Sequence, residues 1–135
     1  MEYWSIRKTG VASKKGVVVS QHAIASKVGA SVLAKGGNAI DAAIATGFAL
    51  GCVEPWMSGI GGCGFMVTRS ADTGKAHAIE FGVKAPFGLN VKDYPLSPGF
   101  DSDLFSWPGV IDNRNVSGPF SVAIPSYVAG VSLAL

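Results

Sequence analysis

The sequence predicts an α+β fold, and three observations lead to that prediction. Two apolar segments with helical spacing, residues 22–35 and 39–53, come before two short strands, residues 65–69 and 76–81. The turn Asp72–Lys75 joins the strands and contains a glycine, which predicts an antiparallel hairpin. Hydrophobic residues make up 48% of the 135 positions and charged residues 15%, which excludes disorder and indicates one domain or less.

Charge and hydropathy exclude several classes of protein. The chain has 11 basic and 9 acidic residues, and a net charge of +2 is too small for a nucleic-acid groove or a basic membrane-binding arm. The longest apolar run, Ala42–Val53, is shorter than the roughly 20 residues of a membrane-spanning helix. Met1–Gly16 lacks the apolar core of a secretion signal, so we expect a cytoplasmic protein with no nucleic-acid or membrane partner.

The first elements are predicted as a strand followed by a helix. Val17–Ser20 is a β-branched run after a glycine, which predicts a buried strand. In the helix over residues 22–35, an apolar residue recurs every four positions at Ile24, Val28 and Val32. This spacing predicts one apolar face.

Asn38 and Asp41 mark the start of the second helix. The Asn38 side chain can accept a hydrogen bond from the N–H of Asp41, and Asp41 can reach back, which is a variant of the capping box. From Ala39 to Val53 the helix is apolar on nearly all sides, which predicts burial on more than one side. Pro55 ends the helix, and a glycine-rich loop over residues 58–64 leads to the first strand of the hairpin.

The last third of the chain changes character. Prolines are scattered through it without a clean period, so we expect an irregular loop region with a short helical turn near Asp101–Phe105. A further helix starts at Pro125 with Val128, Val131 and Leu135 as its apolar stripe, and its uncapped end predicts an incomplete polypeptide. Residues 1–135 are thus predicted to hold a core of helices and strands, an irregular loop region and the start of a helix, over residues 10–81, 82–121 and 122–135.

The glycine-rich loop contains a pattern that also occurs in dinucleotide-binding proteins. Gly59, Gly61 and Gly64 match the GxGxxG spacing, and Glu80 follows where a ribose-binding acid is expected. Such a site needs a strand before the loop and a helix after it, so that the pyrophosphate meets a helix N-terminus. Here the order is reversed, so we expect a tight backbone turn instead and no cofactor.

Four motifs in a fixed order resemble those of one known family. Lys35–Ala43 reads KGGNAIDAA, similar to a KGGNAxDAA signature, and Ala49–Met66 is similar to ALGVVEPxxSGIGGGGFM. Gly16–His22 resembles the opening strand with its histidine turn, and Ala123–Gly130 resembles a VPGxVAG helix start. The family is that of the gamma-glutamyltransferases (gamma-glutamyltranspeptidases), and the resemblance covers residues 11–135.

This resemblance implies the αββα sandwich of an N-terminal-nucleophile hydrolase. Members are made as one precursor that cleaves itself, and the new N-terminal threonine of the small subunit becomes the nucleophile, with its own α-amine as the base. The acyl group then passes through a covalent intermediate to water or an amine, while an oxyanion hole holds the tetrahedral state. The chain corresponds to the front part of the large subunit, so its implied partners are the remainder with the small subunit and a gamma-glutamyl or other small amide substrate.

The threonines of this chain do not match that nucleophile. None of them is followed by the start of a small subunit: Thr9, Thr46, Thr68 and Thr73. We therefore expect no catalytic residue here. The alternative to an enzyme segment is an inactive truncated fragment or a non-catalytic interaction module.

A second departure concerns the substrate. Glutathione-cleaving members bind the α-carboxylate of the glutamyl group with an arginine in an R-E-T/K-A-P stretch, and a guanidinium matches a carboxylate well. Aligned on Ala85-Pro86, this chain has Gly82 in that position, and Lys84 is the nearest cation. The stretch is similar to a variant branch that includes oxamate amidohydrolase, which implies hydrolysis of a small acid amide as the alternative function. Lys84 is the candidate substrate-binding residue, and a solvated loop lysine is the alternative interpretation.

Histidines and aspartates give weaker signals. His22 and His77 are far apart in sequence and lack a third ligand, so no metal is expected, and His22 at a helix start is expected to be structural. Asp101 and Asp103 lack the spacing of a calcium loop and are expected on the surface.

Two further residue types are expected inside the fold. Glu54 follows the second helix and is expected to be partly desolvated. Cys52 and Cys63 do not form a CxxC pair, so they are expected to be small buried side chains rather than redox or metal ligands.

Overall fold

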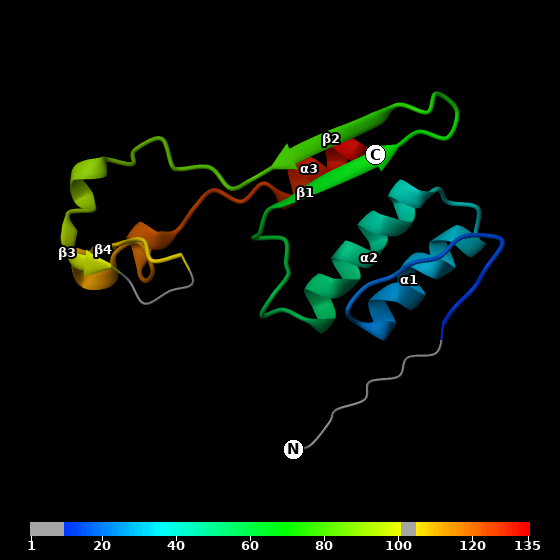
Figure 1. The fold of residues 1–135 in the computed structure, drawn as a ribbon, viewed down its shortest axis with the longest axis horizontal. Helices are drawn as coiled ribbons and strands as arrows, with labels where there is room; N and C mark the ends of the chain where they lie inside the picture. The colour runs from blue at the N-terminus through cyan, green and yellow to red at the C-terminus, as the bar shows by residue number, and fades with distance from the viewer. Residues whose placement is uncertain (1–9, 101–104) are drawn as a thin grey trace, which may run out of the picture.

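The computed structural model describes residues 10–100 and 105–135. Two helices come first, a hairpin follows, and a loop-rich lobe (residues 85–123) leads to the last helix (Figure 1). The bounds are α1 Ala23–Ala34, α2 Ala39–Val53, β1 Gly64–Arg69, β2 Ala76–Phe81, β3 Leu96–Phe100, β4 Pro108–Val110 and α3 Tyr127–Ala134. Helices and antiparallel strand pairs occupy separate stretches of the chain, which confirms the predicted mixture of helix and antiparallel sheet.

Helix α1 buries a different face from the one predicted. Ile24 and Val28 are 54% and 36% exposed, whereas Ala25 and Gly29 are buried. A Cβ atom on Gly29 would lie 2.9 Å from the backbone oxygen of Ala42 in α2, so the two helices are too close for a larger side chain there. The small residues therefore face α2, and the prediction of a buried branched stripe is wrong for Ile24 and Val28.

Helix α2 has the bounds and the cap that the sequence predicts. The Asn38 side-chain oxygen accepts hydrogen bonds from the backbone N–H groups of Ile40 and Asp41, at 2.7 and 3.0 Å. The Asp41 carboxylate accepts one from the Asn38 N–H at 2.8 Å, which completes the capping box. Because these three backbone N–H groups are satisfied and Asp41 lies at the positive end of the helix, the start of α2 is fixed locally.

The hydrophobic core lies where α2, the β1–β2 hairpin and α3 meet. Ile44 of α2, Phe81 of β2 and Val131 of α3 are buried against one another. Met66 and Ile79, which are paired across the hairpin, pack on the same cluster. Both helices therefore contact the same face of the hairpin.

The hairpin forms as predicted, with β1 starting at Gly64. Its register runs from Gly64 opposite Phe81 to Arg69 opposite Ala76, and Gly74 in the turn has a φ of +67°. Strand alternation places Phe65 and Val67 on the face opposite the helices. These two side chains are 75% and 79% exposed, so the hairpin is covered on one face only.

The predicted buried strand over Val17–Ser20 is wrong. The segment is not paired with any strand of the described residues, and Val17 and Val19 are 53% and 85% exposed. Val18 alone of the three valines points inward, toward Gly29 of α1. The β-branched run therefore forms an extended segment beside the helices rather than part of a sheet.

Helix α3 also presents a different stripe from the predicted one. Val131 is buried, but Val128 and Leu135 are 51% and 76% exposed. Tyr127 and Ala134 pack on the core instead. Gly130 sets this face, because the absence of a side chain there lets the ring of Phe81 lie directly against the helix.

The lobe contains two strands that the sequence did not predict. Strands β3 and β4 pair antiparallel, and the Tyr94 hydroxyl donates to the Phe120 backbone oxygen at 2.8 Å. The rings of Tyr94 and Phe120 meet edge to face at 6.0 Å, and the Arg114 guanidinium lies 5.7 Å from the Phe120 ring centre. These contacts order a region without clear periodicity. The helical turn predicted near Asp101–Phe105 lies mainly outside the described residues.

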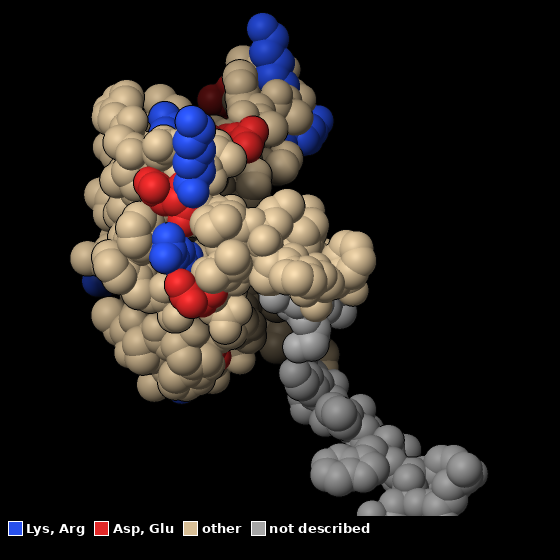
Figure 2. Space-filling view, turned by 90° about the vertical axis from the view of Figure 1, so that its left-hand side faces the viewer, with Lys and Arg blue, Asp and Glu red and all other residues tan. Residues whose placement is uncertain are grey.

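The lobe stands apart from the helices and the hairpin, and two extended stretches connect it to them (Figure 1). Figure 2 shows basic and acidic side chains next to one another on the face formed by the lobe. Within the lobe, Arg114 and Asp112 pair at 3.2 Å. Over residues 10–100 and 105–135, none of the helices is long and apolar enough to cross a lipid bilayer.

The packing of Gly130 against Phe81 gives a stability prediction. Alanine at position 130 would gain about 1 kcal/mol of helix propensity, but its Cβ would lie 2.5 Å from the Cβ of Phe81. We expect Gly130→Ala to lose about 1–3 kcal/mol of unfolding free energy by overpacking. Urea denaturation measures this loss, with Gly88→Ala as the control because position 88 opens on free space. Equal stability of the two variants would contradict the close contact.

Candidate functional site

Lys84 lies on a short segment that connects β2 to the lobe. This segment, Gly82–Lys84, is called the strap below. The Lys84 N–H donates to the Ile124 oxygen at 3.1 Å, and the Ile124 N–H donates to the Lys84 oxygen at 2.8 Å. This isolated antiparallel bridge ties the two stretches that connect the lobe, while the Lys84 side chain stays exposed.

Ser126 holds the other end of the strap. Its hydroxyl lies 2.6 Å from the backbone oxygen of Phe81 and 2.8 Å from that of Gly82. The N–H groups of Ser126 and Tyr127 donate to the Gly62 oxygen at 3.2 and 3.1 Å. The glycine-rich loop, the strap and the start of α3 therefore meet at one residue.

A pocket of about 390 Å³ opens beside the strap. Glu80, Lys84 and Ser126 are among its lining residues, together with apolar residues of α3. The Glu80 carboxylate lies 3.8 Å from the position that a Cβ on Gly82 would take. The pocket thus presents one cation and one anion on a mostly apolar wall, and Lys84 can bind a ligand carboxylate by charge and hydrogen bonding.

The glycine-rich loop has the local order expected from the sequence. Helix α2 precedes it, strand β1 follows it, and the Gly62 N–H closes a turn on the Gly59 oxygen at 3.1 Å. A dinucleotide fingerprint would require a helix to start at the end of this loop. The loop instead gives its Gly62 carbonyl to the start of α3, so its role here is to join backbone segments.

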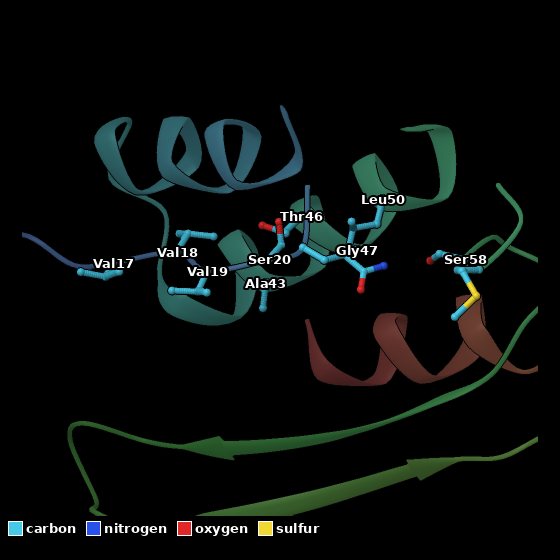
Figure 3. Close-up of a pocket in the computed structure, with 11 residues that line it drawn as sticks. Val17, Val18, Val19, Ser20, Ala43, Thr46, Gly47, Leu50 and Ser58 are labelled. Atoms are coloured by element: carbon cyan, nitrogen blue, oxygen red, sulfur yellow. The ribbon is translucent and has the colours of Figure 1, made fainter. Parts of the chain in front are cut away.

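A larger pocket of about 650 Å³ lies between the extended segment Val17–Gln21 and α2 (Figure 3). Its lining is mostly aliphatic and includes the polar residues Ser20, Thr46 and Ser58. Next to it, Glu54 is 9% exposed and accepts a hydrogen bond from the Gln21 side chain. The predicted desolvation of Glu54 is confirmed, and the contact fastens the extended segment to the end of α2.

The histidines lie apart from the strap pocket. His22 is the N-cap of α1, and its Nδ1 accepts a hydrogen bond from the Ile24 N–H at 3.2 Å, which confirms a structural role. His77 is exposed on β2, opposite Thr68. Within the described residues, no group of three or more His, Cys, Asp or Glu side chains could hold a metal ion. Asp101 and Asp103 lie outside these residues.

The cysteines differ from the expectation, and the described threonines are structural. Cys52 and Cys63 are free and exposed, so the prediction of buried thiols is wrong: α2 and the loop leave this side uncovered. The Thr46 hydroxyl is buried and donates to the Ala42 oxygen at 2.7 Å. Thr68 is in β1 and Thr73 in the hairpin turn, while Thr9 lies outside the described residues.

Sequence reasoning missed Ser126 and Tyr127. The Tyr127 ring contacts the rings of Phe48 and Phe81 edge to face, at 5.5 and 6.1 Å. Burial raises the pKa of the Tyr127 hydroxyl above its ordinary value. The sequence signals were a serine just before a helix and an aromatic residue in its first turn, but neither indicates which strand end they contact.

Comparison with known proteins identifies relatives of the chain. Residues 25–135 match the family model described as Gamma-glutamyltranspeptidase. A "Glutathione hydrolase proenzyme" of Bacillus subtilis subsp. natto is 53% identical over an alignment of 130 residues that covers 90% of this chain and 19% of that protein. The protein of the same name from Pseudomonas sp. (strain A14) is 40% identical over 124 residues, 92% of this chain and 20% of that protein.

Solved structures agree with this result. The crystal structure of Helicobacter pylori gamma-glutamyltranspeptidase superposes with a TM-score of 0.75 at 35% identity and covers 94% of this chain. The match covers 34% of that chain. The present chain spans about a fifth of the length of the curated relatives it matches.

The environment of Tyr127 predicts how stability depends on pH. An unfolded tyrosine ionises at a pH of about 10, whereas burial raises the pKa of Tyr127 in the folded chain. The contribution of the Tyr127 hydroxyl to the free energy of unfolding is therefore complete below the pKa of the unfolded state, and it is lost as the pH rises through the pKa of the folded state. We expect the melting temperature to fall less steeply at alkaline pH in Tyr127→Phe than in the parent chain. Tyr94→Phe serves as the control, and a Tyr127→Phe slope equal to that of the parent would contradict the prediction.

Proposed function

Because the chain belongs to the gamma-glutamyltranspeptidase family, we propose that it forms the front part of the large subunit of a gamma-glutamyltransferase or glutathione-hydrolase-like amidohydrolase. The family match over residues 25–135 is the observation that carries this proposal. The match to about a fifth of each curated relative supports a segment of a longer precursor. The remainder, with the small subunit, is then the main partner of this segment.

The half-covered hairpin supports the proposed αββα sandwich. Helices α2 and α3 cover one face of β1 and β2, and the opposite face exposes Phe65 and Val67. Exposed aromatic and branched side chains on one sheet face are typical of a surface that packs on a second sheet. In the proposed enzyme, the remainder of the protein supplies that second sheet and its helices.

The proposed reaction is acyl transfer from an amide. An N-terminal threonine of the small subunit attacks the amide carbonyl, and its α-amine takes the hydroxyl proton. The α-amine then gives this proton to the leaving nitrogen, so that the C–N bond breaks, the amine departs and an acyl-enzyme forms. Water or an acceptor amine then releases the acyl group, and an oxyanion hole stabilises both tetrahedral states. None of the chemistry falls on this chain. Its proposed task is to hold the acyl end of the substrate through the strap pocket.

Lys84 is the proposed contact for the substrate carboxylate. It lines the strap pocket, and its backbone is held on both sides by the bridge to Ile124. A lysine is a flexible point charge, whereas the arginine of glutathione-cleaving members would bind a carboxylate with two parallel hydrogen bonds. Gly82 occupies the position of that arginine. Within the strap, Lys84 is therefore the one cation that can bind the carboxylate of a glutamyl group.

The position of Gly82 also favours a second candidate function. Without a side chain at position 82, the strap pocket is open beside Glu80. The cation of the pocket is Lys84, two residues after Gly82 in the sequence. A small acid amide of the oxamate type carries its carboxylate next to the scissile amide and fits a displaced cation.

The third candidate, a non-catalytic interaction module, predicts no turnover in any assembled form. A cytoplasmic location also stays a proposal, which cell fractionation tests.

The proposed division of labour predicts that the 135-residue chain is inactive by itself. We expect no hydrolysis of gamma-glutamyl amides or of oxamate, because nucleophile and base belong to the small subunit. A release assay for ammonia and for the leaving amine checks this, with the complete enzyme as the positive control. Turnover by the purified chain that disappears on mutation of one of its own residues would contradict the assignment.

The role of Lys84 predicts a change in substrate affinity of the complete enzyme. A hydrogen bond to a charged group is worth about 1.5–3 kcal/mol, so Lys84→Ala should raise KM about tenfold or more. Lys84→Arg should retain most of the affinity, and Lys75→Ala in the hairpin turn is the matched control. Glutathione and oxamate kinetics, measured in parallel, identify the substrate class. Efficient glutathione cleavage that is indifferent to Lys84 would assign the carboxylate contact to another residue.

A further inference from the structure

We propose that Ser126 is a positioning residue, which holds the strap and thereby fixes the backbone from which Lys84 reaches the substrate. The inference rests on the proposed role of Lys84. Its basis is the pair of carbonyl oxygens, those of Phe81 and Gly82, within 2.6 and 2.8 Å of the Ser126 hydroxyl. Ser126 does not touch the substrate in this proposal and acts through the strap.

The first argument is that Ser126 does not cap its own helix. It is the N-cap residue of α3, but its side chain makes no capping hydrogen bond. A serine in this position normally accepts a hydrogen bond from the second or third N–H of the helix, and this cap stabilises the helix. Here the hydroxyl instead donates to the end of β2, so the tie to the strap takes the place of the cap.

The second argument is that the main chain of Ser126 is itself anchored. The N–H groups of Ser126 and Tyr127 both donate to the Gly62 oxygen. Tyr127 is also wedged between the Phe48 and Phe81 rings. Because this backbone is anchored, the Ser126 hydroxyl holds the strap at a defined position relative to α3 and the glycine-rich loop.

The third argument is that the strap begins with the most flexible residue type. Glycine has no Cβ and loses more backbone freedom on ordering than any other residue, so Gly82 needs an outside contact to define its position. The hydroxyl meets this need from one side, and the Lys84–Ile124 bridge meets it two residues later. Together they determine where the Lys84 side chain starts.

The chemistry of the contact defines the variants. A serine hydroxyl has one proton to donate, which the two carbonyl oxygens share. Ser126→Ala leaves both oxygens without this donor, whereas Ser126→Thr keeps it. Ser31→Ala is the matched control, because the Ser31 hydroxyl also donates to a backbone oxygen, that of Val28 at 2.7 Å, on the exposed side of α1.

The test is steady-state kinetics of the complete enzyme with the substrate that it cleaves best. We expect Ser126→Ala to raise KM about fivefold, the equivalent of one ordinary hydrogen bond, and to leave kcat unchanged. Ser126→Thr should restore KM, and Ser31→Ala should not alter it. An unchanged KM in Ser126→Ala, while Lys84→Ala raises KM, would overturn the inference and leave the proposed function intact.

A double-mutant cycle separates positioning from general stability. If Ser126 acts through Lys84, Ser126→Ala adds nothing to KM once Lys84→Ala is present. Additive effects on KM would overturn the inference, because they would show that Ser126 acts independently of Lys84.

Amide hydrogen exchange tests the tie without any substrate. The Lys84 N–H should exchange faster in Ser126→Ala than in the parent and Ser126→Thr. If Lys84→Ala leaves KM unchanged, the proposed contact between Lys84 and the substrate carboxylate is wrong. Amide exchange then still tests whether the Ser126 hydroxyl holds the strap. Equal exchange in Ser126→Ala and the parent overturns it.

Discussion

The packing of the Phe81 ring is the contact on which the other parts of the structure depend. The ring is buried between Ile44 of α2 and Val131 of α3, and glycines clear the space around it. A Cβ on Gly64 would lie 3.0 Å from the tip of the ring, and one on Gly130 would overlap its base. The hairpin, α2 and α3 therefore meet in one arrangement, because a ring of this size fits only where Gly64 and Gly130 have no side chain.

The strap takes its position from this packing. Gly82 follows Phe81 directly, so the end of β2 places the strap next to the start of α3, where the Ser126 hydroxyl donates to the Gly82 oxygen. The same helix start receives the Gly62 carbonyl from the glycine-rich loop. Core, loop and candidate site are thus linked through hydrogen bonds from the Ser126 hydroxyl and from two backbone N–H groups, so that a change at the core is transmitted to the strap.

Elements with local causes could be predicted from the sequence, and contacts between distant segments could not. The capping box of Asn38 and Asp41 and the hairpin turn are determined within a few residues, so both occur as predicted. The buried faces of α1 and α3 depend on which residues let a neighbour approach, and there Gly29 and Gly130 outweigh the branched side chains. Hydrophobic spacing predicts a helix, but close packing chooses its face. The tie of Ser126 to the strap joins residues 44 and 45 positions apart, which no local pattern encodes.

Solvent exposure of Lys84 has a consequence for the charge balance of the site. In open water the attraction between Lys84 and a carboxylate is weak, because the high dielectric constant and dissolved ions screen it. Glu80, which lines the same pocket, repels that carboxylate and offsets part of the attraction. In the proposed enzyme, any part of the remainder that covers the strap pocket excludes water there, and both interactions then strengthen. The ligand is then oriented as well as held, since its carboxylate is drawn to Lys84 and kept away from Glu80. In the proposed function, selectivity for an acid amide is therefore a property of the assembled enzyme, to which this chain contributes Lys84 on the strap and Glu80 near the end of β2.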